Sequence, residues 1–480
     1  MKGFLTRCVL CLMLIPLAAQ ALSIAAPAQH KAALKRVFVP LSNSANAILL
    51  ERVNPDPARS HIAILVTHPG HINNFNYFLG PALARYGYRV MLLNYYGPQD
   101  SFYEFIRPIA EAITALRALP GVEKVVLAGH SAGGPELTAY EDIAEHGASA
   151  CQAPEVTYKC VGSDFADLPR ADGLMLLDSA AGAPERTDAL DPSIDREHPN
   201  VRNPALDMYD PRNGYDPATH GARYSAGFLK RYYAAVAARS ARLIRQAQSK
   251  LRRIEQGRAK YKDDDPFIVP GSTVQINGSR PQLADILLLA HSRHPHLLLK
   301  ANGTRAVQII HQDFAPEANP AVLDRLHVTT LDTTVIHYLS FQGLRVDPDY
   351  HLTSDDVIGV HWRSTLNSIE GNVQGIRIPT LVISGTCAPH VVYLEIAYEK
   401  SAARDKQFAA VQGANHMFGA CRSQYGDTFD RAFDYVDGWL RKPGRFLSAG
   451  EAAAAAGTAR RFSSDRTPRR GALTSNYRAD

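Results

Sequence analysis

The feature that most constrains the fold is a short apolar run that stops at the sequence Gly-His-Ser-Ala-Gly. Residues 125–128 are Val-Val-Leu-Ala, Gly129 and Gly133 enclose the turn that follows, and residues 135–146 have helical character. Apolar and β-branched residues predict a buried strand, while the two glycines permit a sharp turn around a strained central residue. We therefore predict strand, turn and helix in direct succession, with the Ser131 hydroxyl exposed at the tip of the turn.

Strands and helices alternate on both sides of this turn. Apolar runs predict further strands at 61–67, 88–93, 173–177, 380–384 and 407–411. Helical periodicity is found at 74–86, 102–119, 391–403 and 427–440. Two shorter runs, 36–41 and 47–53, flank a Ser/Asn turn and predict an antiparallel hairpin. This alternation predicts an α/β protein with a mostly parallel sheet, helices on both faces, and ligands at the carboxyl ends of the strands.

The alternation is interrupted between residues 183 and 376, after the sixth predicted strand. This insertion is rich in Pro, Asp and Asn and contains one long helical pattern, for which Ser225 is the expected N-cap. Apolar residues recur in it at spacings of three and four, and basic residues from Arg239 to Arg253 occupy most other positions. We expect a mainly helical cap over the sheet whose long helix has a solvated basic face, with short β-like runs at 273–276, 297–299 and 306–310.

The N-terminus has the pattern of a secretory signal peptide. Lys2 and Arg7 flank an apolar run at 8–19, and Ala19-Gln20-Ala21 offers a small-x-small cleavage site. No other segment is apolar and long enough to span a bilayer. We therefore expect cleavage after residue 21 and an exported protein, periplasmic or secreted, with no stable membrane span in its mature form.

The formal charge is concentrated in a C-terminal tail. Loss of residues 1–21 lowers the charge from +5 to +3, and the tail from Arg441 carries about +6, so the body before it carries about −3. A body of this charge does not suggest a nucleic-acid-binding surface. Residues 442–480 are mostly Ala, Arg, Ser and Gly, and we expect a disordered basic tail. The α/β core is then expected at 22–182 and 377–441.

Cysteine use agrees with an oxidising compartment. Four cysteines remain after residue 21, and four cysteines allow three pairings that the sequence alone cannot choose between. Proximity favours a short loop closed by Cys151 and Cys160, which leaves Cys387 and Cys421.

A serine hydroxyl attacks a carbonyl carbon well only when a positioned base removes its proton. His416 is the natural candidate, because it follows the last predicted strand and so lies at the same end of the sheet as Ser131. The attack also builds negative charge on oxygen, which needs backbone N–H donors. Ala132 would supply one donor, and Gly70 or His71, in the loop after strand 61–67, would supply the other.

These features together resemble the α/β-hydrolase superfamily of serine esterases and lipases, in which the serine turn is called the nucleophile elbow. The resemblance covers residues 36–182 and 377–441, and inserted caps are common in that family. It implies a catalytic serine, acid and histidine in that order along the chain, which Ser131 and His416 respect.

The sequence differs from the family pattern at the position expected for the catalytic acid. Members often carry Gly-x-x-Asp after the penultimate strand, but here the sequence is Gly-Thr-Cys-Ala-Pro-His, with Ala388 in the acid position. Glu395 is the next carboxylate and is the favoured candidate, while Asp178, at the end of the sixth strand, is the alternative. Because Cys387 lies in this loop and Cys421 follows His416, a disulfide between them would tie the two loops together.

The resemblance implies a serine hydrolase that cleaves a small-molecule carboxylic ester through an acyl-enzyme. The same residues serve amide, thioester and carbon–carbon cleavage, and the missing Gly-x-x-Asp leaves a binding protein that has lost turnover as an alternative. We expect no metal, because His291, His294 and His296 have no acid or cysteine at a zinc-like spacing. No phosphate loop or dinucleotide motif is present, so no cofactor is expected.

Overall fold

The computed structural model describes residues 32–42, 44–68, 73–96, 101–194, 201–261, 263–272, 280–313 and 330–447. The predicted signal peptide, the β-like run at 273–276 and the predicted tail beyond residue 447 lie outside these ranges. Across the described ranges, no helix combines the length and the apolar character that crossing a membrane requires.

A ten-stranded sheet forms the centre of the molecule, with strand order β1-β2-β4-β3-β5-β6-β13-β14-β8-β9. Neighbouring strands are parallel from β4 to β8, and the antiparallel pairs β1–β2, β2–β4 and β8–β9 lie toward the two edges. The predicted mostly parallel sheet with an antiparallel hairpin at one edge is therefore confirmed. Its strands are β1 (Leu34–Ser42), β2 (Ala45–Arg52), β3 (Ile62–Thr67), β4 (Arg89–Tyr95), β5 (Lys124–Ser131), β6 (Gly173–Ser179), β8 (His291–Leu299), β9 (Arg305–His311), β13 (Thr380–Gly385) and β14 (Lys406–Val411).

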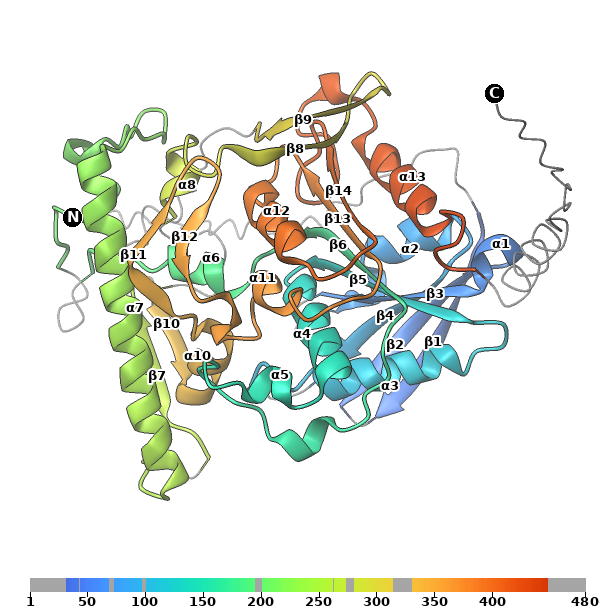
Figure 1. The fold of residues 1–480 in the computed structure, drawn as a ribbon, viewed down its shortest axis with the longest axis horizontal. Helices are drawn as coiled ribbons and strands as arrows, with labels where there is room; N and C mark the ends of the chain where they lie inside the picture. Colours follow the sequence, from blue (N-terminus) through green and yellow to red (C-terminus); the bar gives the residue numbers. More distant parts are fainter. Residues whose placement is uncertain are drawn as a thin grey trace, which may run out of the picture.

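Helices cover both faces of this sheet (Figure 1). In β3, Ile64 and Val66 face one apolar cluster while Ala63 and Leu65 face the other, as the two-residue period of a strand requires. The first face is covered by α2 (Leu79–Ala84) and α13 (Thr428–Leu440), and the second by α3 (Ile106–Arg117), α4 (Gly133–His146) and α12 (Val391–Lys400). The short helices α1 (Pro57–Ser60) and α5 (Ser149–Gln152) lie in connections.

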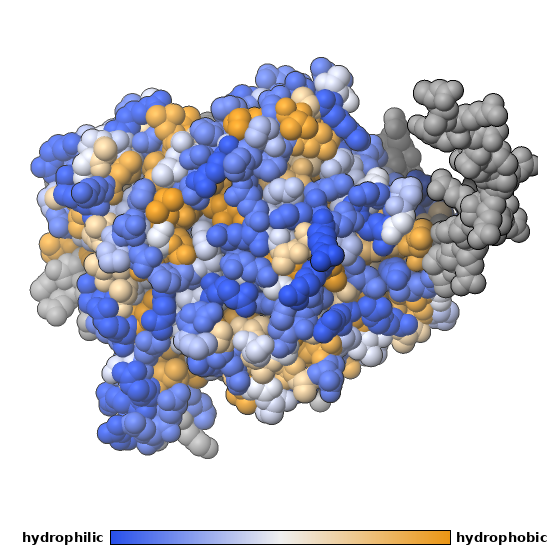
Figure 2. Space-filling view, in the orientation of Figure 1, coloured by the Kyte–Doolittle hydropathy of each residue, from blue (hydrophilic) through white to orange (hydrophobic). Residues whose placement is uncertain are grey.

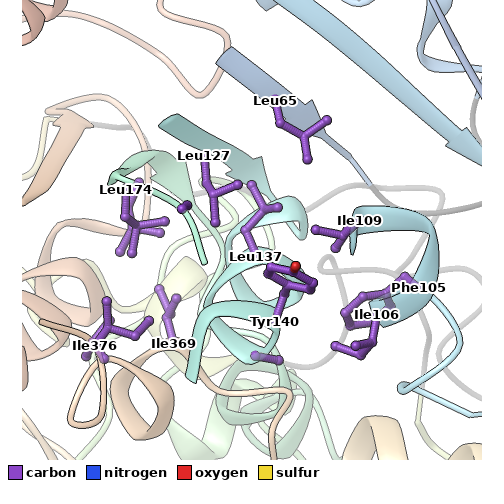
Figure 3. Close-up of a cluster of buried hydrophobic side chains, with 14 of the residues drawn as sticks. Leu65, Phe105, Ile106, Ile109, Leu127, Leu137, Tyr140, Leu174, Ile369 and Ile376 are labelled. Atoms are coloured by element: carbon purple, nitrogen blue, oxygen red, sulfur yellow. The ribbon is translucent and has the colours of Figure 1, made fainter. Parts of the chain in front are cut away.

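The second face shows how the core positions the serine turn. Figure 3 shows Leu127 of β5 among Leu65 and Leu174 of the neighbouring strands, with Leu137 and Tyr140 of α4 packed against them. All five side chains are fully buried, and burial of one such side chain stabilises a fold by about 1.5–3 kcal/mol. This packing fixes α4 against β5, and so defines where the turn between them lies.

The insertion contains the predicted long helix, α7 (Ala226–Glu255), and the Ser225 hydroxyl caps it by accepting the Phe228 N–H at 3.2 Å. It also contains α6 (Ala183–Asp188), α8 (Pro281–Ala284), α10 (Val335–Gln342), α11 (Ile369–Asn372) and two small antiparallel sheets, β7 (Pro266–Pro270) with β10 (Thr330–Thr334) and β11 (Val346–Leu352) with β12 (Val357–Val360). Figure 1 shows α7 and the small sheets at one side of the molecule.

Part of the insertion extends the central sheet and does not cap it. Leu297, Leu298 and Leu299 of β8 pair in parallel with β14, and β9 then pairs with β8. The prediction that residues 183–376 form only a cap is therefore wrong for this hairpin. Pairing with β8 satisfies the backbone groups along β14, and β9 becomes the edge strand on this side.

The basic face of α7 is solvated along most of the helix, with Lys230, Arg231, Arg242 and Arg245 exposed. Arg252 and Arg253, near its C-terminus, are exposed, and Figure 2 shows hydrophilic residues gathered at that lower end of the helix. Arg239 instead is buried, and its guanidinium donates to the backbone carbonyls of Asp191 and Pro270. The expectation that Arg239 belongs to the solvated face is thus wrong, because it anchors the helix to the backbone at Asp191 and at the end of β7.

Candidate active site

Ser131 occupies a sharp turn between β5 and α4. It is the last residue of β5, has a φ of 53°, and α4 begins two residues later at Gly133. A positive φ is uncommon for a residue with a side chain and marks a strained position. Ser131 is buried, with 6% of its surface exposed, so the expectation of an exposed hydroxyl at the tip of the turn is wrong. The predicted strand, turn and helix are confirmed.

The two glycines of the turn are required by close backbone approach. A Cβ on Gly133 would lie 2.2 Å from the carbonyl oxygen of Thr67, in β3, and one on Gly129 would lie 2.7 Å from the Cα of Gly134. Both obstacles are backbone atoms of packed elements, so they cannot move aside as a flexible side chain can. Any larger residue would push α4 away from the sheet.

We therefore expect Gly133→Ala to lower the free energy of unfolding by about 3 kcal/mol, the upper part of the usual range for overpacking. Urea unfolding followed by circular dichroism measures this. Gly438→Ala is the matched control, because a Cβ on that glycine of α13 meets no atom within 4 Å. An unfolding free energy for Gly133→Ala equal to that of the control would contradict this explanation.

His416 and Asp178 meet at the same end of the sheet as Ser131. Asp178 lies near the end of β6, and its Oδ2 is 2.6 Å from Nδ1 of His416. The backbone N–H of Ala180 donates to the Ser131 carbonyl at 2.9 Å, which ties the end of β6 to the serine turn. Since Nδ1 of His416 contacts the carboxylate, Nε2 is the ring nitrogen left to face a substrate or Ser131.

The structure places Glu395, the favoured acid, elsewhere. Glu395 is buried on α12, where its carboxylate accepts the backbone N–H groups of Arg293 and His294 and lies 2.7 Å from Nε2 of His296. The prediction that Glu395 accompanies His416 is therefore wrong. Its helix turns this side chain toward the start of β8, and the alternative acid, Asp178, takes the place beside His416.

Asp178 is surrounded by donors. Its Oδ1 accepts from the Ser384 hydroxyl at 2.7 Å and from the Gly385 N–H at 3.2 Å. Burial by itself raises the pKa of this carboxyl, but the charge of His390 and hydrogen bonds from His390 and His416 outweigh burial and hold the pKa well below its usual value. Asp178 is thus a carboxylate at any physiological pH.

His390 is a site residue that sequence reasoning missed. It immediately precedes α12, and its Nδ1 lies 3.0 Å from the same Asp178 oxygen that His416 contacts. Its Nε2 lies 3.3 Å from Oε1 of Glu185, on α6. Burial disfavours its charge, but the carboxylates of Glu185 and Asp178 raise its pKa to about 10. The sequence feature that could have identified His390 is its position in the loop that lacks the expected acid, two residues after Ala388.

Two further histidines near Ser131 are neutral. Burial, with a smaller contribution from His416, lowers the pKa of His68 to about 4 and the pKa of His130 well below its usual value. His130 lies between the Tyr77 hydroxyl at Nδ1 and the His416 carbonyl oxygen, 2.7 Å from Nε2. Its Nε2 therefore carries the proton and donates to His416, which fixes the backbone of the His416 loop beside the serine turn.

The predicted oxyanion donors are described only in part. Ala132 directly precedes the first residue of α4, so its N–H belongs to the first turn at the helix start. Gly70 and His71 lie outside the described residues, and their role stays a prediction. Asn74, which follows that loop, donates from its side chain to the carbonyl oxygen of His68, which precedes the loop, at 3.2 Å.

Both predicted disulfides are present. Cys151 is bonded to Cys160, and Cys387 is bonded to Cys421 with their Cα atoms 6.3 Å apart. The second bond joins the loop after β13 to the loop that carries His416. The Cys387 N–H also donates to the Ala414 carbonyl oxygen at 2.9 Å, so the two loops are linked twice.

Among the described residues, one set has ligand atoms close enough together to hold a metal ion: Asp178, His390 and His416. These atoms all lie within 4.8 Å of one another. We assign them to hydrogen bonding, because both Nδ1 atoms lie at donor distance from one carboxylate oxygen. The histidine cluster on β8 is divided differently: His296 pairs with Glu395, and His294 lies 3.1 Å from Glu399 near the surface.

No protein-family model and no curated protein matches the sequence. Among solved structures, the chain is similar to Est1E from Butyrivibrio proteoclasticus, with 11% identity, a TM-score of 0.35, and coverage of 85% of this chain and 99% of that one. It is similar to the siderophore hydrolase EstB from Aspergillus fumigatus, with 11% identity, a TM-score of 0.39, and coverage of 85% and 98%. It is similar to a dienelactone hydrolase from Anabaena variabilis, with 9% identity, a TM-score of 0.34, and coverage of 86% and 98%.

The sheet order and the strained serine after β5 are those of the α/β-hydrolase fold, so the predicted fold is confirmed. At these identities and TM-scores, the argument for function comes from the geometry of the site.

Proposed function

We propose that the protein is a serine hydrolase that cleaves carboxylic esters through an acyl-enzyme intermediate. The observation that carries this proposal is the hydrogen bond of 2.6 Å between His416 and the buried carboxylate of Asp178, beside the strained serine turn. A carboxylate that orients a histidine near a serine is the arrangement that activates the serine as a nucleophile.

The reaction follows from these contacts. Nε2 of His416 accepts the proton of the Ser131 hydroxyl as its oxygen bonds to the ester carbonyl carbon, and the carbonyl oxygen becomes an oxyanion. Ala132 and the predicted donor at Gly70 or His71 stabilise that charge. His416 then gives the proton to the leaving alcohol. A water molecule, deprotonated by His416, attacks the acyl-enzyme and releases the acid and free Ser131.

The ester specificity, the export and the small-molecule substrate belong to this proposal. Two disulfides favour an oxidising compartment, and the predicted signal peptide would deliver the chain to one. The alternative of an inactive binding protein arose from the missing Gly-x-x-Asp acid, and the position of Asp178 beside His416 removes that reason for it.

A fluorophosphonate probe tests the assignment of the nucleophile. We expect the wild-type protein to be labelled and Ser131→Ala to show no labelling, because the probe bonds only to an activated serine. Ser163→Ala is a suitable control, since Ser163 is a surface residue far along the chain from the serine turn. A wild-type protein that resists the probe, or label found on Ser131→Ala, would overturn the proposal. A matched panel of esters, thioesters and amides would then identify the bond that is cleaved.

A further inference from the structure

The carboxylate of Asp178 contacts two histidines. His390 and His416 place their Nδ1 atoms 3.0 and 2.6 Å from one oxygen of Asp178, and their ring centroids are 5.0 Å apart. The reaction described above uses only one of them. His390 is 3% exposed, so substrate does not reach it through solvent, and its second nitrogen faces the buried carboxylate of Glu185.

The charges around His390 form an alternating row. Asp178 is followed by His390, then Glu185, then Arg280, whose Nη2 lies 3.6 Å from Glu185. Asp178 lies on β6 and His390 lies in the loop before α12. Glu185, on α6, and Arg280, just before α8, belong to the insertion. Isolated charges are strongly disfavoured in a buried site, and opposite charges in contact are retained. The row indicates that His390 is a cation here.

The other titratable groups that face this row do not offset that cation. His68 and His130, next to His416, are kept neutral by burial. Burial likewise raises the pKa of Glu370, near Glu185, well above its usual value, which favours the uncharged form of that side chain. Asp188, on the far side of Arg280, accepts hydrogen bonds from the hydroxyls of Tyr350 and Tyr393. The charge that lies nearest to the Asp178–His416 pair is therefore that of His390.

We propose that His390 is a positioning residue that orients Asp178 and, as an imidazolium, keeps His416 neutral down to a lower pH than Asp178 alone would allow. This inference rests on the proposed function, because His416 matters only if it acts as the base. A lone carboxylate stabilises a protonated His416, which cannot accept the serine proton. A neighbouring cation opposes that protonation, so the site stays active in mildly acid solution.

The sign of the effect is testable with His390→Gln, which keeps a side-chain N–H for Asp178 and removes the charge. The pKa of His416 should rise, and the acid limb of kcat/KM should move to higher pH by about one to two pH units, given the distance between the rings. Activity should fall about tenfold or more at the low-pH end and return to within about threefold of wild type on the alkaline plateau. A merely structural loss would lower kcat/KM equally at every pH.

Histidine-selective NMR titration gives a readout that does not depend on turnover. The His416 signals are assigned by their loss in His416→Gln, and their midpoint is compared in wild type and His390→Gln, with EDTA in all samples. His296→Gln is the matched control, because it also removes a buried histidine from a carboxylate, that of Glu395. We expect the control to lose stability without moving the His416 midpoint.

His390→Gln could leave Glu185 unpaired and so fail to fold. In that case the double variant Glu185→Gln/His390→Gln, which removes both charges, is measured in its place. The same upward shift is then expected, but smaller, since the more distant negative charge is removed as well. An unchanged His416 midpoint in the folded variant would overturn the proposal. A wild-type protein without turnover or probe labelling would instead overturn the proposed function, while the NMR shift would still report on the charge of His390.

Discussion

Asp178→Asn is expected to lower kcat/KM for the best ester by about a thousand- to ten-thousand-fold, the loss known for the equivalent change in serine proteases. Asparagine keeps the size of the side chain but loses the charge that stabilises protonated His416 during the reaction. Its amide also places a donor where the two imidazole N–H groups need an acceptor. Initial rates across pH, compared on protein shown to be folded by circular dichroism, measure the effect.

Glu395→Gln is the matched control for this prediction. Glu395 is as deeply buried as Asp178 and also contacts a histidine, but that histidine is His296 and not His416. We expect this change to reduce stability, because the carboxylate accepts two backbone N–H groups, and to leave kcat/KM within about threefold of wild type. If Glu395→Gln abolished activity and Asp178→Asn did not, the assignment of the acid would be reversed.

Removing the bond between Cys387 and Cys421, by replacing both with alanine, is expected to lower the free energy of unfolding by roughly 3–4 kcal/mol. The two cysteines are 34 residues apart, and a cross-link over a longer loop removes more entropy from the unfolded chain. The bond also joins the two loops that flank the Asp178–His416 contact, so we expect kcat to fall about tenfold when the loops are freed.

The bond between Cys151 and Cys160 is the natural comparison. It closes a separation of only 9 residues, so its removal should cost roughly 2–3 kcal/mol. It lies after α4 and away from the loops of the site, so kcat should be unchanged in folded protein. Chemical unfolding together with ester turnover measures both variants. Equal losses of kcat in the two would show that the second disulfide has no special bearing on the site.

The α/β core could be predicted from the sequence because its signals are local. A buried strand shows itself in a run such as 125–128, and a sharp turn in the glycines around Ser131, with no knowledge of the rest of the chain. The helix α7 and its Ser225 cap were recognisable for the same reason. His416 could be placed near Ser131 because parallel strands bring their carboxyl ends to one edge of the sheet.

The acid could not be chosen from the sequence, because the choice depends on directions that no local pattern records. Asp178 lies near the end of β6 and Glu395 lies after β13, but Glu395 is on a helix that turns it toward β8. Asp178 instead has a φ of 45°, a conformation that only tertiary contacts impose on a residue with a side chain. His390 was unrecognised because its two carboxylate partners are more than 200 residues away along the chain.

The place of β8 in the sheet has a consequence for how the chain is made. β8 and β9 precede β13 and β14 in sequence, but in the sheet they lie beyond β14. During synthesis the hairpin emerges before the strand that it pairs with, and its inner edge has no parallel partner until the C-terminal strands arrive. The four strands beyond β6 are therefore joined to the sheet last, by the same segment that carries His416. A nascent chain thus gains its candidate base only when this side of the sheet is complete.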